Sequence, residues 1–178
     1  MIQNIAIIGL NRDVSYEVAK QLATELDMFF FDGLELFEFD NIPRTLTDIL
    51  KEYGVEYYRK KEKSIVGYSS EFENCVINLE SGVSENEKNF VTLKETTLVV
   101  YLKDNVEEIK NAIAQKEYKT QEEKEFFDVD LLVLKNRDEK LRVNADLVVE
   151  VNGNSVLKFV LGDVNSNAFS RQAGNINA

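Results

Sequence analysis

The chain has 178 residues, of which 44% are hydrophobic and 30% are charged, and its formal net charge at neutral pH is −11. This composition is typical of a globular domain with a sizeable core, and the negative charge opposes binding of nucleic acid or of an anionic membrane surface. The sequence contains no histidine, which excludes Ser-His-Asp and Cys-His catalysis within the chain and removes the commonest metal ligand.

The sequence has neither an apolar run of membrane-spanning length nor the features of a signal peptide. We therefore expect a cytoplasmic protein that does not enter a membrane. Its one cysteine, Cys75, lies in a short apolar run. This context predicts a buried structural thiol rather than a nucleophile.

The first predicted elements are a strand, a tight loop and a helix. Ile5 to Ile8 form an unbroken apolar run that ends at Gly9, which is typical of a strand buried on both faces of a parallel sheet. The helix that follows has apolar residues on one side: Val18, Ala19, Leu22, Ala23 and Leu26. A phosphate-binding loop lies in this arrangement in P-loop kinases.

The loop itself departs from the P-loop pattern G-x-x-x-x-G-K-[ST]. Counting from Gly9, Val14 stands where the second glycine belongs, and a β-branched residue resists the backbone conformation that glycine permits. Ser15 and Tyr16 stand where the lysine and the magnesium-binding hydroxyl residue belong. Asp13 adds a negative charge where phosphates would lie. The order of elements is that of a nucleotide kinase, whereas the chemistry of the loop is lost.

The rest of the chain alternates between strands and helices. Further strands are predicted at residues 28–31, 74–79, 97–102 and 147–151. Helices are predicted at residues 34–39, 45–53, 55–66, 84–90, 104–116, 126–140 and 155–161. This alternation predicts an α/β domain with a five-stranded parallel sheet. The domain is expected to cover residues 1–162, and the polar segment 163–178 is expected to be a disordered tail.

Individual residues predict where several helices begin and end. Pro43 is expected at the start of the helix that Gly54 ends. Ser84 and Asp104 are expected to cap the helices that follow them, because their side chains accept hydrogen bonds from free backbone N–H groups. The strongly polar segment 117–125 is expected to be mobile.

The sequence from residue 4 to residue 151 resembles shikimate kinase, a small P-loop kinase of the nucleoside-monophosphate-kinase type. The matching segments are Ile7-Ile8-Gly9, the first helix, Phe31-Asp32, Tyr58-Arg59 with Glu62, Val99-Val100-Tyr101-Leu102, and Arg137 with Ala145-Asp146. The resemblance implies a three-layer α/β/α P-loop fold with the strand order 2-3-1-4-5.

Several positions that the resemblance makes functional carry other residues here. The lysine and the metal-binding serine of the family correspond to Ser15 and Tyr16, and the aspartate placed to act as a base corresponds to Leu34. The segment 103–136, which corresponds to the lid, contains no arginine. A single cationic contact to the transferring phosphoryl group commonly contributes on the order of a thousandfold in rate. Losing these groups together predicts a rate near background.

Four positions match the family's site: Asp32, Arg59, Gly82 and Arg137. The resemblance implies that the two arginines hold a substrate carboxylate, for which a guanidinium is well suited. The alternative for Arg59 is a solvated charge in a lysine-rich helix, and the alternative for Arg137 is a charge at the C-terminal end of a helix. Asp32 could be a metal-side carboxylate, and a turn residue is the favoured alternative. Glu80 replaces a glycine and would place a negative charge beside a bound acid.

Arg12 could supply the loop with a replacement cation. The favoured alternative is a surface ion pair with its neighbour Asp13, which would contribute little energy.

The sequence therefore favours a shikimate-kinase-like domain that has lost ATP-dependent phosphoryl transfer and has a binding, regulatory or structural role. No cofactor is expected. ATP and Mg²⁺ are expected only under the alternative, a divergent active small-molecule kinase in which Arg12 or a lid lysine serves the phosphate site. A third possibility is a structural domain whose pocket is filled by its own side chains. The expected partners are a small carboxylate ligand or a protein, and no nucleic acid or membrane.

Overall fold

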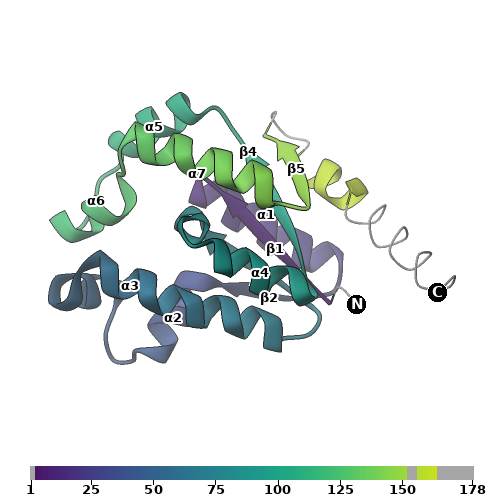
Figure 1. Ribbon diagram of the computed structural model, residues 1–178, viewed down its shortest axis with the longest axis horizontal. Coiled ribbons are helices and arrows are strands. Elements are labelled where there is room, and N and C mark those ends of the chain that lie inside the picture. Colours follow the sequence, from purple (N-terminus) through teal and green to yellow (C-terminus); the bar gives the residue numbers. More distant parts are fainter. Residues whose placement is uncertain (1–2, 152–155, 164–178) are drawn as a thin grey trace, which may run out of the picture.

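The computed structural model describes residues 3–151 and 156–163 and shows a five-stranded sheet between layers of helices (Figure 1). The strands are β1 (Asn4–Gly9), β2 (Phe29–Asp32), β3 (Cys75–Glu80), β4 (Thr97–Lys103) and β5 (Leu147–Glu150). Neighbouring strands are parallel, and their order is β2-β3-β1-β4-β5. The predicted fold class and strand order are confirmed.

The helices are α1 (Arg12–Glu25), α2 (Gly33–Asp40), α3 (Leu46–Glu71), α4 (Glu87–Thr96), α5 (Val106–Ala114), α6 (Gln121–Phe127) and α7 (Leu131–Asn144). A 3-10 helix, η1 (Ser81–Glu85), follows β3, and residues 156–163 are also helical. Apart from Asp163, the predicted tail lies outside the described residues. In the part of the chain that the structure describes, no helix has the length and apolar character needed to cross a bilayer.

Side chains of β1 alternate between two apolar clusters, one on each face of the sheet. Ile5 and Ile7 pack with α1 and with residues 156–163, whereas Ala6 and Ile8 pack with the helices of the other layer. Figure 1 shows α3, α4 and α7 in front of the sheet and α1 behind it. The unbroken apolar run of β1 is explained by this double cover, which leaves no face of a central parallel strand in water.

Cys75 confirms the prediction of a buried thiol. It is 0% exposed at the start of β3, and burial raises the pKa of its thiol to about 11. A thiol with so high a pKa is a poor nucleophile at neutral pH.

The second strand is less buried than predicted. Within residues 3–151 and 156–163, β2 pairs with β3 alone and forms an edge of the sheet. Phe29, the first residue of β2, is therefore 66% exposed, whereas Phe31 packs against the core and stacks on Phe72. The apolar sequence of this strand did not distinguish an edge from a central position.

Gly54 separates two helical segments of α3, as predicted. Its backbone angles, φ 75° and ψ 175°, are not helical and are accessible to glycine without strain, so the helix axis kinks at this residue. Thr45 caps the start of α3 in a capping box with Asp48. Pro43, which was predicted at the start of this helix, lies shortly before the cap.

Other helix starts also differ from the predictions. Asn86, and not Ser84, caps α4, because η1 intervenes between β3 and the helix. Asn105, and not Asp104, accepts the hydrogen bonds at the start of α5. Residues 121–127 form the separate helix α6, although they were assigned in part to a mobile segment and in part to the next helix.

Candidate functional site

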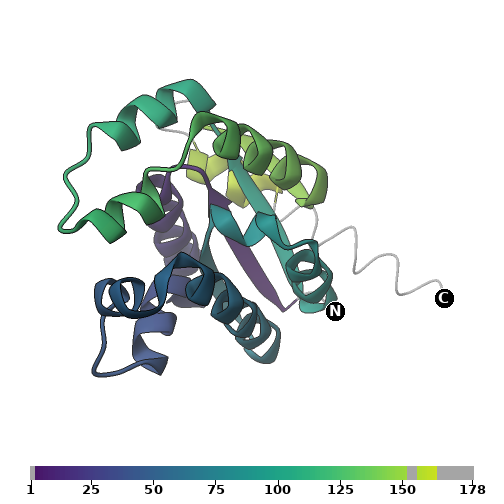
Figure 2. The ribbon, with the colours of Figure 1, turned by 60° about the vertical axis from the view of Figure 1, so that its left-hand side comes forward.

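The candidate site lies at the carboxyl ends of β1, β2 and β3. In the register of the sheet, Gly9 at the end of β1 is the partner of Glu80 at the end of β3, and Asp32 at the end of β2 is the partner of Asn78. Figure 2 shows α5 and α6 at this end of the molecule, together with α2 and the first part of α3. Ligands of open α/β sheets bind at this edge, outside the carboxyl ends of the strands.

The segment after Gly9 is the start of a helix rather than an extended loop. α1 begins at Arg12, and the Ser15 N–H already donates to the Asn11 carbonyl at 3.1 Å. The Ser15 side chain is buried, and its Oγ donates to the Arg12 carbonyl at 3.0 Å. A Cβ added to Gly9 would lie 3.1 Å from the Ser15 Cβ. Gly9 therefore serves the close packing of α1 on β1, and Ser15 faces inward.

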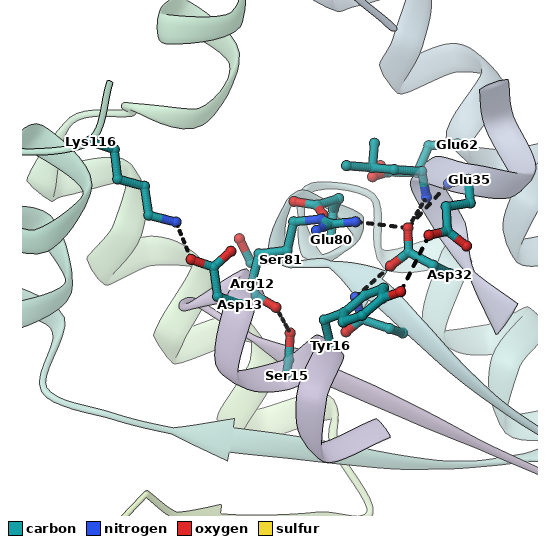
Figure 3. Close-up of polar contacts among 12 residues, drawn as sticks. Arg12, Asp13, Ser15, Tyr16, Asp32, Glu35, Glu62, Glu80, Ser81 and Lys116 are labelled. Atoms are coloured by element: carbon teal, nitrogen blue, oxygen red, sulfur yellow. Dashed lines mark hydrogen bonds and ion pairs between the residues drawn. The ribbon is translucent and has the colours of Figure 1, made fainter. Parts of the chain in front are cut away.

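Arg12 lies between two acidic side chains (Figure 3). Its Nη2 is 2.8 Å from Asp32 Oδ1, and its Nε is 2.6 Å from Glu80 Oε1. The side chains of Asp32 and Glu80 are only 1% and 11% exposed. The guanidinium also lies 5.5 Å from the centre of the Tyr16 ring. Because a buried charge needs a partner, Arg12 links the start of α1 to the ends of β2 and β3.

The predicted surface ion pair between Arg12 and Asp13 is wrong. Consecutive residues of a helix do not face each other, so the two side chains diverge. Asp13 pairs instead with Lys116, from the segment between α5 and α6. Lys116 is one of the lid lysines that the sequence offered as a replacement cation.

Asp32 also caps α2. Its Oδ1 accepts from the backbone N–H groups of Leu34 and Glu35, both at 3.1 Å, and the Asn78 amide donates to its Oδ2 at 2.7 Å. This capping agrees with the turn role that the sequence favoured. The ion pair with Arg12 was missed, because its partners are 20 positions apart. Asn78 was missed as well, although a polar residue inside the apolar run of β3 was a usable signal.

Tyr16 does not point its hydroxyl toward a phosphate position. Its ring packs edge-on against Phe30, with 5.2 Å between the ring centres, and its hydroxyl donates to Glu35 at 3.4 Å. Tyr16 therefore fills space between α1 and β2 beside the Arg12 ion pairs.

Arg59 and Arg137 converge on the carboxylate of Glu85. Arg137 donates to Glu85 Oε1 through Nε at 2.8 Å and also through Nη2, and Arg59 Nε lies 3.7 Å from Glu85 Oε2. Each arginine has a further partner. Arg137 Nη1 donates to Ser81 Oγ at 3.2 Å, and Arg59 Nη1 donates to Glu62 Oε1 at 2.9 Å. One carboxylate of the chain thus spans the two guanidinium groups.

The alternatives are wrong for both arginines, because Arg59 is not solvated and Arg137 lies in the middle of α7. Their side chains are only 14% and 8% exposed, and the Arg59 guanidinium lies over the rings of Tyr58 and Phe126 at 5.3 Å and 5.2 Å. Burial, together with the nearby charge of Arg59, lowers the pKa of Arg137. An anion between the two guanidinium groups relieves this repulsion.

Two glutamates that pair with arginines of the site, Glu62 and Glu80, have raised pKa values. Burial raises the pKa of Glu62 to about 7, although the charge of Arg59 opposes this shift. Burial also raises the pKa of Glu80, against the opposing charge of Arg12. Glu62 therefore changes its protonation state near neutral pH.

Comparison with known proteins covers most of the chain. The family model for shikimate kinase matches residues 17–163. The chain belongs to the shikimate kinase family. The shikimate kinase of Clostridium botulinum (strain ATCC 19397 / Type A) is 30% identical over 138 residues, 78% of this chain and 75% of the relative. That of Thermoanaerobacter pseudethanolicus is 29% identical over 140 residues, 79% of this chain and 75% of the relative.

Solved shikimate kinase structures confirm the fold. The crystal structure of shikimate kinase from Aquifex aeolicus is 25% identical, with a TM-score of 0.73, and the match covers 93% of this chain and 98% of that one. Shikimate kinase from Acinetobacter baumannii, in complex with shikimate, is 22% identical with a TM-score of 0.73, and the match covers 94% and 95%.

The range matched by the shikimate kinase family model begins directly after the altered loop. The match starts at residue 17, whereas the departures from the P-loop pattern lie between Gly9 and Tyr16. The matched range includes Asp32, Arg59, Gly82 and Arg137. The match to the family model therefore does not include β1 or the segment from Gly9 to Tyr16.

Gly82→Ala is expected to displace Arg59 and to lower the free energy of unfolding by about 1–2 kcal/mol. A Cβ on Gly82 would lie 2.1 Å from Arg59 Nη1, so this guanidinium must leave its contacts with Glu62 and Glu85. Urea denaturation measures the loss. Gly67→Ala in α3 is the matched control, because, among the described residues and apart from the neighbouring backbone of the helix, no atom lies within 4 Å of its added Cβ. Gly67→Ala should stabilise the helix by about 0.5–1 kcal/mol, and equal losses in both variants would contradict the assignment.

Proposed function

We propose that this member of the shikimate kinase family does not transfer phosphoryl groups and acts by binding, in a regulatory or structural role. The observation that carries the proposal is the position of Arg12. Its guanidinium forms ion pairs with Asp32 and Glu80 at the end of the sheet, so Arg12 already has two carboxylates of the chain as partners. Because Cys75 is a buried free thiol, a reducing compartment such as the cytoplasm suits the protein.

A magnesium-bound triphosphate does not fit the residues after Gly9. A P-loop holds phosphates with free backbone N–H groups and a lysine, whereas Ser15 here has no positive charge and donates inward. The exposed side chain in the first turn is Asp13, which repels phosphate. The carboxylate of Asp32 is already held by two backbone N–H groups, Asn78 and Arg12, so a metal ion would have to displace these donors.

A binding role is supported by the arginine pair. Arg59 and Arg137 lie on different helices and hold one carboxylate between them, which is a geometry suited to a small carboxylic acid. The structural neighbour from Acinetobacter baumannii was solved with shikimate, itself a small carboxylic acid. We therefore take a small carboxylate as the ligand class.

Mg-ATP is expected to leave the thermal unfolding temperature unchanged within about 1 °C, because the loop has no group to grip the phosphates. For a protein of this size, a nucleotide present at about one hundred times its Kd would stabilise the fold by about 2.7 kcal/mol, which corresponds to a rise of roughly 5–10 °C. Differential scanning fluorimetry with ATP, with and without Mg²⁺, measures the shift. A magnesium-dependent rise of several degrees would overturn the proposal.

The second candidate is a divergent active kinase. It is favoured by the curated relatives, which are named shikimate kinase, and by the pairing of Arg59 with Glu62 beside Arg137. It requires Arg12 to leave its carboxylates or Lys116 to leave Asp13. A coupled assay of ADP release with shikimate and Mg-ATP decides between the candidates. A shikimate-dependent rate of about 1 s⁻¹ or more, abolished by Arg59→Ala, would establish the kinase.

A further inference from the structure

Glu85 is the residue that occupies the arginine pair. It is the last residue of η1, and its carboxylate reaches Arg137 with one oxygen and Arg59 with the other. The side chain of Glu85 is 43% exposed, whereas that of Arg137 is 8% exposed. The two cations therefore belong to the interior of the protein, and the anion that they hold approaches from solvent.

The contacts of Glu85 are unequal. Arg137 binds it through two nitrogen atoms, but the distance to Arg59 is 3.7 Å, which is an ion pair without a hydrogen bond. An anion of another shape could come closer to Arg59 while keeping the contact with Arg137. Glu85 therefore satisfies the charges of this site without satisfying the hydrogen-bonding capacity of Arg59.

A cavity of about 380 Å³ opens beside Glu85, between α3 and η1. Among the residues that line it are Arg59, Lys60, Lys63, Gly82 and Glu85. Its volume is sufficient for a small organic acid. Lys60 and Lys63 are exposed on α3 at its rim, where they attract an anion toward Arg59.

We propose that Glu85 is an exchangeable internal ligand of Arg59 and Arg137, and that a small carboxylate entering through this cavity takes its place. The inference rests on the proposed binding role. Because Glu85 is tethered to the site, it competes at a high effective concentration and weakens the apparent affinity for every external carboxylate. Only acids that make further contacts in the cavity displace it. Binding then releases the Glu85 carboxylate to solvent, beside the start of α4.

Glu85→Ala is expected to bind shikimate at least tenfold more tightly than the unmodified protein, as measured by isothermal titration calorimetry. Removing the internal carboxylate leaves the two guanidinium groups to the external one. Glu87→Ala is the matched control, because Glu87 is an exposed acidic residue two positions further on. This control should bind shikimate as the unmodified protein does.

Two further measurements identify the exchange. The gain in affinity that Glu85→Ala shows for shikimate should be absent for the methyl ester of shikimate, which lacks the carboxylate. It should also be absent when Arg137→Met is combined with Glu85→Ala. Glu85→Gln removes the charge and keeps the shape of the side chain, and it should give a smaller gain in affinity for shikimate. This variant tests the inference even if Glu85→Ala does not fold. Equal affinities of Glu85→Ala and the unmodified protein, no binding by either, or an equal gain with the methyl ester would overturn the inference. None of these outcomes bears on catalysis, which the Mg-ATP and ADP-release assays test separately.

Discussion

Arg12→Met is expected to lower the free energy of unfolding by about 3 kcal/mol at pH 8, the largest loss that we predict for a single substitution. Methionine keeps the apolar stem of the side chain and removes the charge. Asp32 and Glu80 are then left with negative charges in positions that are 1% and 11% exposed. Chemical denaturation in urea measures the change.

The loss in Arg12→Met should depend on pH. Burial raises the pKa of Glu80 and the charge of Arg12 opposes that shift, so removing Arg12 raises the pKa of Glu80 further. The variant can then take up a proton on Glu80, and its loss of stability at pH 5 should be smaller than at pH 8.

Arg142→Met is the control for this substitution. Arg142 is 48% exposed and lies 3.5 Å from Asp138 on the same helix. Its replacement should change stability by no more than about 0.5 kcal/mol, because exposed ion pairs contribute little. If Arg12→Met lowered the free energy of unfolding no more than this control does, the ion pairs of Arg12 with Asp32 and Glu80 would not stabilise the fold.

The free energy of unfolding is expected to fall as the pH rises from 5 to 8, and Glu62→Gln should remove most of this fall. Burial raises the pKa of Glu62 from 4.5 to about 7 in the folded chain. Between these two values the folded protein holds a proton that the unfolded chain has released. The stabilisation is therefore complete below about pH 4.5 and is lost as the pH rises through 7. Its full amplitude is of the order of 3 kcal/mol.

Urea denaturation at several pH values measures this dependence in the unmodified protein and in Glu62→Gln. Glu56→Gln is the control, since Glu56 is an exposed glutamate on the same helix. This control should keep the pH dependence of the unmodified protein. Parallel curves for Glu62→Gln and the unmodified protein would show that the buried carboxyl group is not the source.

The predictions from sequence were most accurate where structure depends on local pattern. The apolar run of β1 and the helix after it were identified because burial on both faces of a parallel strand leaves a continuous signal. Errors fell at helix boundaries. Ser84 and Asp104 have the right chemistry for caps, but the neighbouring Asn86 and Asn105 do the capping. Which residue caps a helix depends on where the preceding segment turns the backbone.

The arginine pair was predicted in part. The sequence named Arg59, Gly82 and Arg137 through family resemblance, and the structure brings them together. Nothing in the sequence indicated that Glu85 would lie between the two guanidinium groups. Glu85 is 52 positions from Arg137 and belongs to a 3-10 helix that was not predicted.

By itself the sequence determined the fold class, the strand order through the family resemblance, and the absence of the lysine and hydroxyl residue of a P-loop after Gly9. Only the tertiary structure decided what Arg12 and Glu85 do. Arg12 reaches Glu80 because Gly9 and Glu80 are partners in the register of β1 and β3. Glu85 reaches Arg137 because η1 and α7 pack against each other. Local sequence pattern specifies which residues are helical or extended, but an ion pair between distant residues depends on how those elements are placed against one another.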